Sequence, residues 1–162
     1  NVSSAQFHCQ DFVEKLKETL NRTQFPPNAL MLEITESLLI KQDNETLGQL
    51  QALSDLGVLL SIDDFGTGYS SLSYLKQFPI DVLKIDRSFI KDITHNEEDK
   101  ALTCAILSMA SSLGLKVVAE GVENQDQLDL LTENQCQFIQ GYLFSKPLTF
   151  DRFKAYLQHS QT

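Results

Sequence analysis

The sequence is poor in the residues that form thiolate metal sites or disulfide frameworks. Its 162 residues include three cysteines and three histidines, and none of them has the spacing of a zinc site. The cysteine number is odd and Cys104 lies in an apolar helical pattern, which favours reduced thiols in a cytoplasmic protein. No apolar run approaches the ~18 residues of a membrane span, and nothing resembles a signal peptide. We therefore expect a cytoplasmic segment with no direct membrane contact.

Positive charge is also scarce. The 13 lysines and arginines face 22 acidic residues, and the net charge of −9 disfavours binding of DNA or RNA polymers. A small phosphate ester remains an acceptable ligand if bound metal ions offset the local negative charge. The segment Gly66-Thr67-Gly68 lacks the third glycine of a dinucleotide-binding fingerprint, so a dinucleotide cofactor is not expected.

Short apolar runs alternate with helical patterns along the chain. Each run ends at polar residues, and the runs lie within residues 29–36, 58–64, 82–86, 116–123 and 138–141. Helices are expected at about residues 45–56, 98–113 and 126–133. The alternation predicts parallel βαβ units. Polar residues at the ends of five successive strands favour a (β/α)8 barrel over an open doubly wound sheet, which collects ligands at one switch point.

The chain is short for such a barrel, which usually needs about 250 residues. Five strands are recognisable and residues 1–3 are expected to end a sixth, so about six of the eight strands are present. We expect a fragment with open sheet edges that is poorly stable as a lone monomer, and in which apolar strand residues lose part of their packing. Those residues are Leu30, Leu32, Leu60, Ile62, Val117 and Ile139.

Two adjacent carboxylates, Asp63 and Asp64, end the second apolar run. Like charges about 4 Å apart repel by roughly 1 kcal/mol in water, and by several where water is thinned out. A hard divalent cation such as Mg²⁺ or Mn²⁺ would relieve this repulsion. The alternative is a solvated turn in which one aspartate caps a helix that starts near Ser70 and Ser71. The residues alone leave both interpretations open.

Six segments occur in the order found in bacterial EAL domains. They are Asn1-Val2-Ser3, Glu33-Ile34-Thr35-Glu36-Ser37, residues 63–72, Leu83-Lys84-Ile85-Asp86, Ala119-Glu120-Gly121-Val122-Glu123 and Gln140-Gly141-Tyr142. Essentially the whole chain thus resembles the cyclic-di-GMP phosphodiesterases of this family. The resemblance implies an α/β fold, an incomplete (β/α)8 TIM-like barrel of EAL type, in which residues 1–162 form the C-terminal two-thirds of a single EAL domain.

The resemblance also implies two bound ions, Mg²⁺ or Mn²⁺. Asn1, Glu33 and Asp63 resemble the ligands of the first ion, and Asp63 would bridge to a second ion that Asp64 also holds. Such a pair of ions, about 3.5–4 Å apart, suits the hydrolysis of a phosphodiester, because one ion activates water and both stabilise the oxygens in line.

The other family positions carry catalytic and binding roles. Lys84 and Glu120 resemble the pair that orients and deprotonates the attacking water, which fits their chemistry. Gln140 and Glu123 occupy positions of substrate-binding polar groups, and Glu36 resembles the glutamate that tethers the loop of residues 66–72.

Each of these residues has a structural alternative. Lys84 could instead pair with Asp86 inside the barrel, and Gln140 could be a satisfied buried amide. Glu36 and Glu123 could merely cap helices.

The Glu-Ala-Leu tripeptide that names the family does not occur in the 162 residues. We therefore expect this chain alone to be catalytically inactive. The expected function is metal-dependent hydrolysis of cyclic-di-GMP to linear pGpG. The alternative is a degenerate or truncated EAL domain that binds cyclic-di-GMP or another protein without cutting. The resemblance further implies a homodimer, and GGDEF or sensory domains elsewhere in the parent protein.

Overall fold

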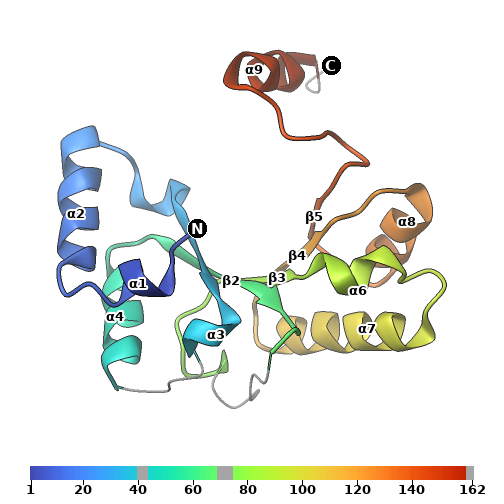
Figure 1. The fold of residues 1–162 in the computed structure, drawn as a ribbon, viewed down its shortest axis with the longest axis horizontal. Coiled ribbons are helices and arrows are strands. Elements are labelled where there is room, and N and C mark those ends of the chain that lie inside the picture. Colours follow the sequence, from blue (N-terminus) through green and yellow to red (C-terminus); the bar gives the residue numbers. More distant parts are fainter. Residues whose placement is uncertain (40–43, 69–74, 160–162) are drawn as a thin grey trace.

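The computed structural model describes residues 1–39, 44–68 and 75–159. Five parallel strands form one sheet in the order β1-β2-β3-β4-β5 (Figure 1): β1 Met31–Thr35, β2 Leu59–Phe65, β3 Val82–Ile85, β4 Lys116–Glu120 and β5 Phe138–Gln140. Neighbours in sequence are neighbours in the sheet, as in a barrel, whereas a doubly wound sheet reverses its order. The predicted α/β fold with a partial barrel is thereby confirmed.

The predicted sixth strand is reduced to a single contact. Val2 forms an isolated parallel bridge to Ile34, and its amide donates to the Glu33 carbonyl at 2.8 Å. The predicted helix start at Ser70 and Ser71 lies outside the described residues.

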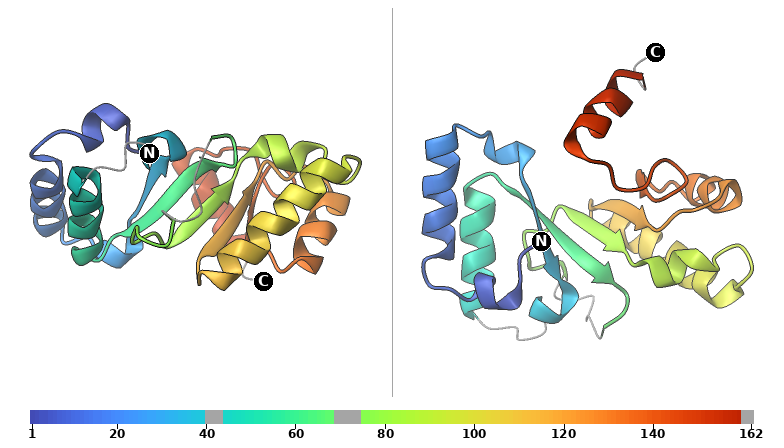
Figure 2. Two further views of the ribbon diagram at one scale, coloured as in Figure 1. Left: turned by 90° about the horizontal axis from the view of Figure 1, so that it is seen from below. Right: turned by 45° about the horizontal axis from the view of Figure 1, so that its top comes forward.

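Helices connect the strands and cover one face of the sheet. They are α1 Ser4–Phe7, α2 Phe12–Thr23, the 3-10 turn η1 Pro27–Ala29, α3 Glu36–Leu39, α4 Asn44–Asp55, α6 Arg87–Lys91, α7 Glu97–Ser112, α8 Gln125–Glu133 and α9 Phe150–His159. The predicted α4, α7 and α8 are confirmed to within a residue at each end. Asn96 and Asn124 cap α7 and α8 with their side chains, as short polar residues do at helix starts. No prediction covered α9, which stands apart from the sheet in Figures 1 and 2.

The sheet has one apolar face and one polar face, because successive strand residues alternate sides. Helix α4 contacts β2, and α7 contacts β3 and β4, so these helices cover the apolar face. Its residues form the core, and they include Leu32, Ile34, Leu60, Ile62, Leu83, Ile85, Val117 and Ala119.

The expectation that strand residues lose packing is wrong for four of the six. Leu32, Leu60, Ile62 and Val117 are only 8%, 0%, 0% and 1% exposed, because they point toward the helices and not toward the barrel interior. The exposed apolar strand residues lie on the opposite face, where Met31 is 37% exposed and Phe138 is 50% exposed.

Candidate functional site

Polar side chains from neighbouring strands gather on one face, near the carboxyl ends of the strands. The register aligns Thr35 of β1 with Asp63 of β2, and Glu120 of β4 with Gln140 of β5. Parallel pairing brings all carboxyl ends to one edge, so residues distant in sequence become neighbours there.

A bulge in β2 explains how two adjacent aspartates can serve one site. Ile62 pairs with Leu83 and Phe65 pairs with Ile85, so β2 contains one more residue than β3 over this interval. Asp64 takes up the extra length with a φ of 55°, a left-handed conformation that aspartate tolerates better than most residues. A regular strand would send neighbouring side chains to opposite faces, whereas the bulge redirects Asp64 toward the side of Asp63.

Lys84 lies at the centre of the site. Its Nζ is 2.9 Å from Glu33 Oε1, 2.9 Å from Asp63 Oδ1 and 2.8 Å from Glu120 Oε1, and only 7% of its side chain is exposed. Burial opposes the charged ammonium, but the hydrogen bonds to Glu120, Asp63 and Glu33 outweigh it and raise the pKa of Lys84. The ammonium is therefore permanently charged at neutral pH.

The alternative pairing of Lys84 with Asp86 is wrong. The Asp86 carboxylate instead accepts a hydrogen bond from the Ser88 amide at 3.0 Å and caps α6. Asp86 directly follows the last residue of β3 and is the N-cap residue of α6.

An acidic cluster suited to a metal ion lies beside Lys84. Asp63, Asp64 and Glu120 each offer a carboxylate oxygen, and these atoms lie within 4.8 Å of one another. Burial, and then the charges of Asp63 and Asp86, raise the pKa of the Asp64 carboxyl. Three convergent carboxylates are a hard-oxygen donor set that fits Mg²⁺ or Mn²⁺.

The other two predicted metal ligands are placed differently. The Glu33 carboxylate contacts Lys84 directly, and Asn1 is exposed at the start of the chain, next to the Val2 bridge. Glu120, predicted as a catalytic base, is brought into the acidic cluster with the two aspartates. The division of these residues between metal binding and proton transfer stays a prediction.

Glu36 is buried at 3% exposure and reaches the loop that follows β2. Its Oε2 accepts hydrogen bonds from the amides of Gly66 at 3.1 Å and Gly68 at 3.2 Å. The carboxylate thus joins the start of α3 to this loop, which is more than a helix cap would do.

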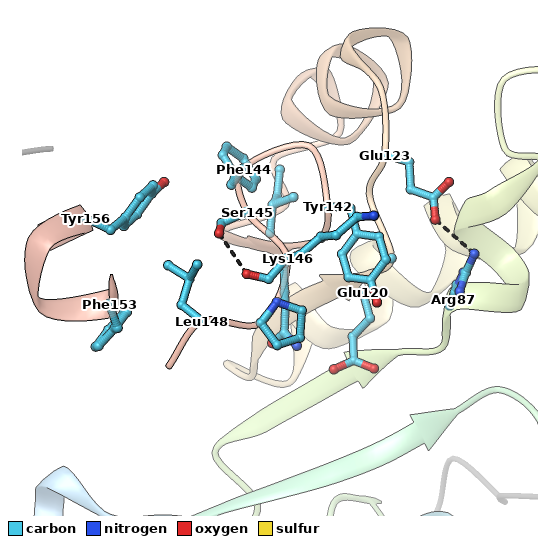
Figure 3. Close-up of a pocket in the computed structure, with 15 residues that line it drawn as sticks. Arg87, Glu120, Glu123, Tyr142, Phe144, Ser145, Lys146, Leu148, Phe153 and Tyr156 are labelled. Atoms are coloured by element: carbon cyan, nitrogen blue, oxygen red, sulfur yellow. Dashed lines mark hydrogen bonds and ion pairs between the residues drawn. The ribbon is translucent and has the colours of Figure 1, made fainter. Parts of the chain in front are cut away.

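A groove of about 750 Å³ opens next to Glu120 (Figure 3). Glu120, Glu123 and Gln140 contribute to its lining, so Gln140 is an exposed groove residue and not a buried amide. Glu123 does not cap α8 with its side chain, since Asn124 does so. Its carboxylate accepts a hydrogen bond from Arg87 Nη2 at 2.9 Å.

Sequence reasoning assigned a site role to Glu120, Glu123 and Gln140 but to none of the other residues that line the groove. Three polar residues among the others are Arg87, Tyr142 and Lys146, and the Lys146 Nζ lies 5.6 Å from the Tyr142 ring centroid. Arg87 directly follows Asp86, and Tyr142 comes two residues after Gln140. The search for polar residues at the carboxyl ends of strands could therefore have been extended to both.

The chain matches the EAL domain family over residues 1–147. It is 48% identical to the cyclic di-GMP phosphodiesterase NbdA of Pseudomonas aeruginosa over 98% of its own length and 20% of that protein. The solved PaMucR phosphodiesterase in complex with c-di-GMP is 42% identical and superposes with a TM-score of 0.91, covering 94% of this chain and 62% of that one. The manganese/cy-diGMP complex of Klebsiella pneumoniae BlrP1 at pH 9.0 is 34% identical with a TM-score of 0.80, covering 88% and 36%.

These similarities define the class of the protein. The chain belongs to the EAL domain family. It spans about a fifth of the length of the first curated relatives that it matches. Within the described residues, none of the helices has the length and apolar character needed to cross a bilayer.

Proposed function

We propose that the chain forms the metal-binding and water-activating part of a phosphodiesterase that hydrolyses cyclic-di-GMP to linear pGpG. The observation that carries this proposal is the convergence of Lys84 with Glu33, Asp63 and Glu120 beside a groove large enough for a small ligand. The similarity to the NbdA phosphodiesterase and to the c-di-GMP complex of PaMucR supports cyclic-di-GMP as the substrate.

Divalent ions would bind at Asp63 and Asp64, with Glu120, Glu33 and Asn1 as further oxygen donors. Such ions supply Lewis acidity to the phosphoryl oxygens and lower the pKa of bound water. The manganese complex of BlrP1 supports Mn²⁺, and the carboxylate donors suit Mg²⁺ equally. Two ions and the bridging role of Asp63 belong to this proposal.

The chain's own groups perform the proton transfer in this proposal. The Lys84 ammonium orients a water molecule, and a carboxylate oxygen of Glu120 accepts its proton. The water oxygen forms a bond to phosphorus while the bond from phosphorus to the 3′-oxygen breaks. The leaving 3′-oxygen takes up a proton from solvent water, and Glu120 releases the proton it accepted back to solvent. Gln140 and Glu123, at the groove, bind the nucleotide.

The test combines turnover and binding. The chain, and any longer protein that contains it, is incubated with cyclic-di-GMP and saturating Mn²⁺, and pGpG is followed by chromatography. Glu120→Gln should lower turnover by about 10²-fold or more, since it removes a proton acceptor with little change of volume. Glu123→Gln, the matched control, should weaken binding more than turnover.

Three outcomes are distinguishable. Turnover that depends on Glu120 supports the enzyme. Cyclic-di-GMP binding without turnover in every form of the protein supports the alternative, a binding module. Absence of both contradicts the proposal. Homodimerisation, and linkage to GGDEF or sensory domains, are further parts of the proposal that sedimentation and the full gene sequence would test.

A further inference from the structure

Arg87 lies between β3, which carries Lys84, and the segment that follows Glu120. It is not among the site residues predicted from the sequence. It is the first residue of α6, three positions after Lys84 of β3. Across the strand ends it faces the segment after β4, where Gly121 and Glu123 follow Glu120. One side chain thus spans from the lysine strand to the segment that carries the proposed base.

The aliphatic stem of Arg87 packs directly on the backbone of Gly121. A Cβ atom placed on Gly121 would lie 2.8 Å from Arg87 Cβ and 2.9 Å from its Cδ, both too close for real atoms. Gly121 also has a φ of +74°, which favours glycine. The glycine therefore serves a close approach, and the stem of Arg87 is the group that approaches.

The same segment is held from its other side. The Val122 amide donates to the Gln140 carbonyl at 3.2 Å, and the Leu143 amide donates to the Val122 carbonyl at 3.0 Å. Val122 is fully buried, and a Cβ on Gly141 would overlap its backbone. Residues 121–122 are thus enclosed between the Arg87 stem and the chain beyond β5, which leaves the backbone next to Glu120 little freedom.

The guanidinium of Arg87 makes a second, separate contact. Nη2 donates to Glu123 Oε1 at 2.9 Å, and both groups line the groove (Figure 3). Their side chains are 58% and 45% exposed, and ion pairs so accessible to water add little to stability. What this pair can do is fix the direction of the Glu123 carboxylate at the groove wall.

We propose that Arg87 is a positioning residue with two separable actions. Its stem holds Gly121, and through it the Glu120 carboxylate, in the acidic cluster. Its guanidinium holds Glu123 in the orientation that binds the ligand in the groove. The second action rests on the proposed function, whereas the first requires only that the cluster binds a divalent ion.

The experiment separates the stem from the charge. Arg87→Met keeps a long stem and removes the charge, Arg87→Ala removes both, and Arg87→Lys keeps both. Calorimetry measures Mn²⁺ affinity in each variant, and separately cyclic-di-GMP affinity in the presence of Ca²⁺, an ion present in a BlrP1 complex. Arg22→Ala, in the last turn of α2, is the control for loss of a surface arginine.

Arg87→Ala should weaken Mn²⁺ binding about tenfold, the scale seen when groups that support metal ligands are removed. Arg87→Met should keep the Mn²⁺ affinity within about twofold but weaken cyclic-di-GMP binding about tenfold, as Glu123→Gln should. Arg87→Lys should retain both affinities within about threefold, because a single donor suffices for the contact.

Unchanged Mn²⁺ affinity in Arg87→Ala would overturn the action of the stem. Unchanged cyclic-di-GMP affinity in Arg87→Met would overturn the action of the guanidinium. If the unmodified chain does not bind cyclic-di-GMP, the proposed function fails while the Mn²⁺ titrations still decide the first action. Circular dichroism verifies folding, and Arg87→Ser replaces the alanine variant should that one not fold.

Discussion

Lys84 is the residue on which three carboxylates of the site converge, and its charge compensates theirs. A buried ion pair contributes little net stability when intact, but removing one partner leaves the other charges uncompensated. Lys84 is 7% exposed in its side chain, so water screens these charges poorly. The site is therefore sensitive to the loss of this one cation.

We expect Lys84→Met to destabilise the metal-free protein by about 3 kcal/mol, because the Glu33, Asp63 and Glu120 carboxylates lose their common partner. Urea unfolding in the presence of EDTA measures the change. Lys116→Met, at the exposed start of β4, is the matched control and should change stability by less than about 0.5 kcal/mol. Equal effects of the two variants would contradict the compensating role.

The pH dependence of this contribution follows from its sign. The folded-state pKa of Lys84 is raised above its ordinary value of 10.5, so its stabilisation is fully present below that pH. It is lost only as pH rises through the higher folded-state pKa. The stability difference between the unmodified chain and Lys84→Met should therefore not decline between neutral pH and about pH 10 through any titration of Lys84 itself.

Asp64 has the opposite effect on the metal-free fold. Its pKa is raised above the ordinary 3.8, so the folded state holds the proton more tightly and stability falls as pH rises through this window. Asp64→Asn should therefore raise the melting temperature at pH 7 in EDTA and abolish most of the increase that Mn²⁺ gives. A lower melting temperature in EDTA would contradict this account of the Asp64 carboxylate.

Among the elements, β2 and the loop after it do most to shape the site. The bulge turns Asp64, and Gly66 follows with a φ of +99° in a turn. A Cβ at Gly66 would lie 2.9 Å from Phe89 Cε2, so the loop passes close under α6. The Glu36 carboxylate holds the same loop from α3 through the amides of Gly66 and Gly68.

Two glycine substitutions should therefore have opposite signs. Gly66→Ala should destabilise by about 1–2 kcal/mol, because alanine strains at positive φ and meets Phe89. Gly48→Ala, inside α4 with no atom within 4 Å of the added Cβ, should stabilise by about 0.5–1 kcal/mol. Thermal unfolding of both variants measures this. A Gly66→Ala variant as stable as the unmodified chain would contradict the need for glycine at this position.

The sequence predicts the elements better than the connections between them. Periodicity, caps and apolar runs locate α4, α7, α8 and all five strands, since these signals are local. The bulge at Asp64 and the left-handed residue within it leave no such signal, because any polar residue can follow a strand. The packing of Arg87 on Gly121 joins segments 34 positions apart in sequence numbering, so only the fold reveals it.

The faces of the strands illustrate the same difference. The apolar run of residues 58–64 predicts a strand, but the sequence does not show whether Leu60 and Ile62 face the helices or the barrel interior, and both are fully buried. In α9, Phe150, Phe153 and Tyr156 remain 79%, 49% and 40% exposed, so this helix does not bury these aromatic side chains against the sheet. Family resemblance located Glu33, Lys84 and Glu120, whereas geometry showed that one ammonium contacts all three.

For the whole molecule, the negative net charge determines what the binding of an anionic ligand requires. A chain of net charge −9 gathers carboxylates at one edge of its sheet and offers Lys84 as the cation among them. An anionic ligand near this edge would meet strong repulsion unless further cations bind first. Ligand binding should therefore depend on the divalent ion, which makes ion binding the first step to measure.

The most direct measurement is a calorimetric titration of Mn²⁺ into the unmodified chain and into Asp63→Asn, at equal pH and ionic strength. Asp63 contacts Lys84 and belongs to the acidic cluster, and we propose that it bridges two ions. We expect saturable Mn²⁺ binding by the unmodified chain and loss of most of that binding in Asp63→Asn. Equal affinities in the two proteins would rule out the bridging role and leave Asp63 as a structural partner of Lys84.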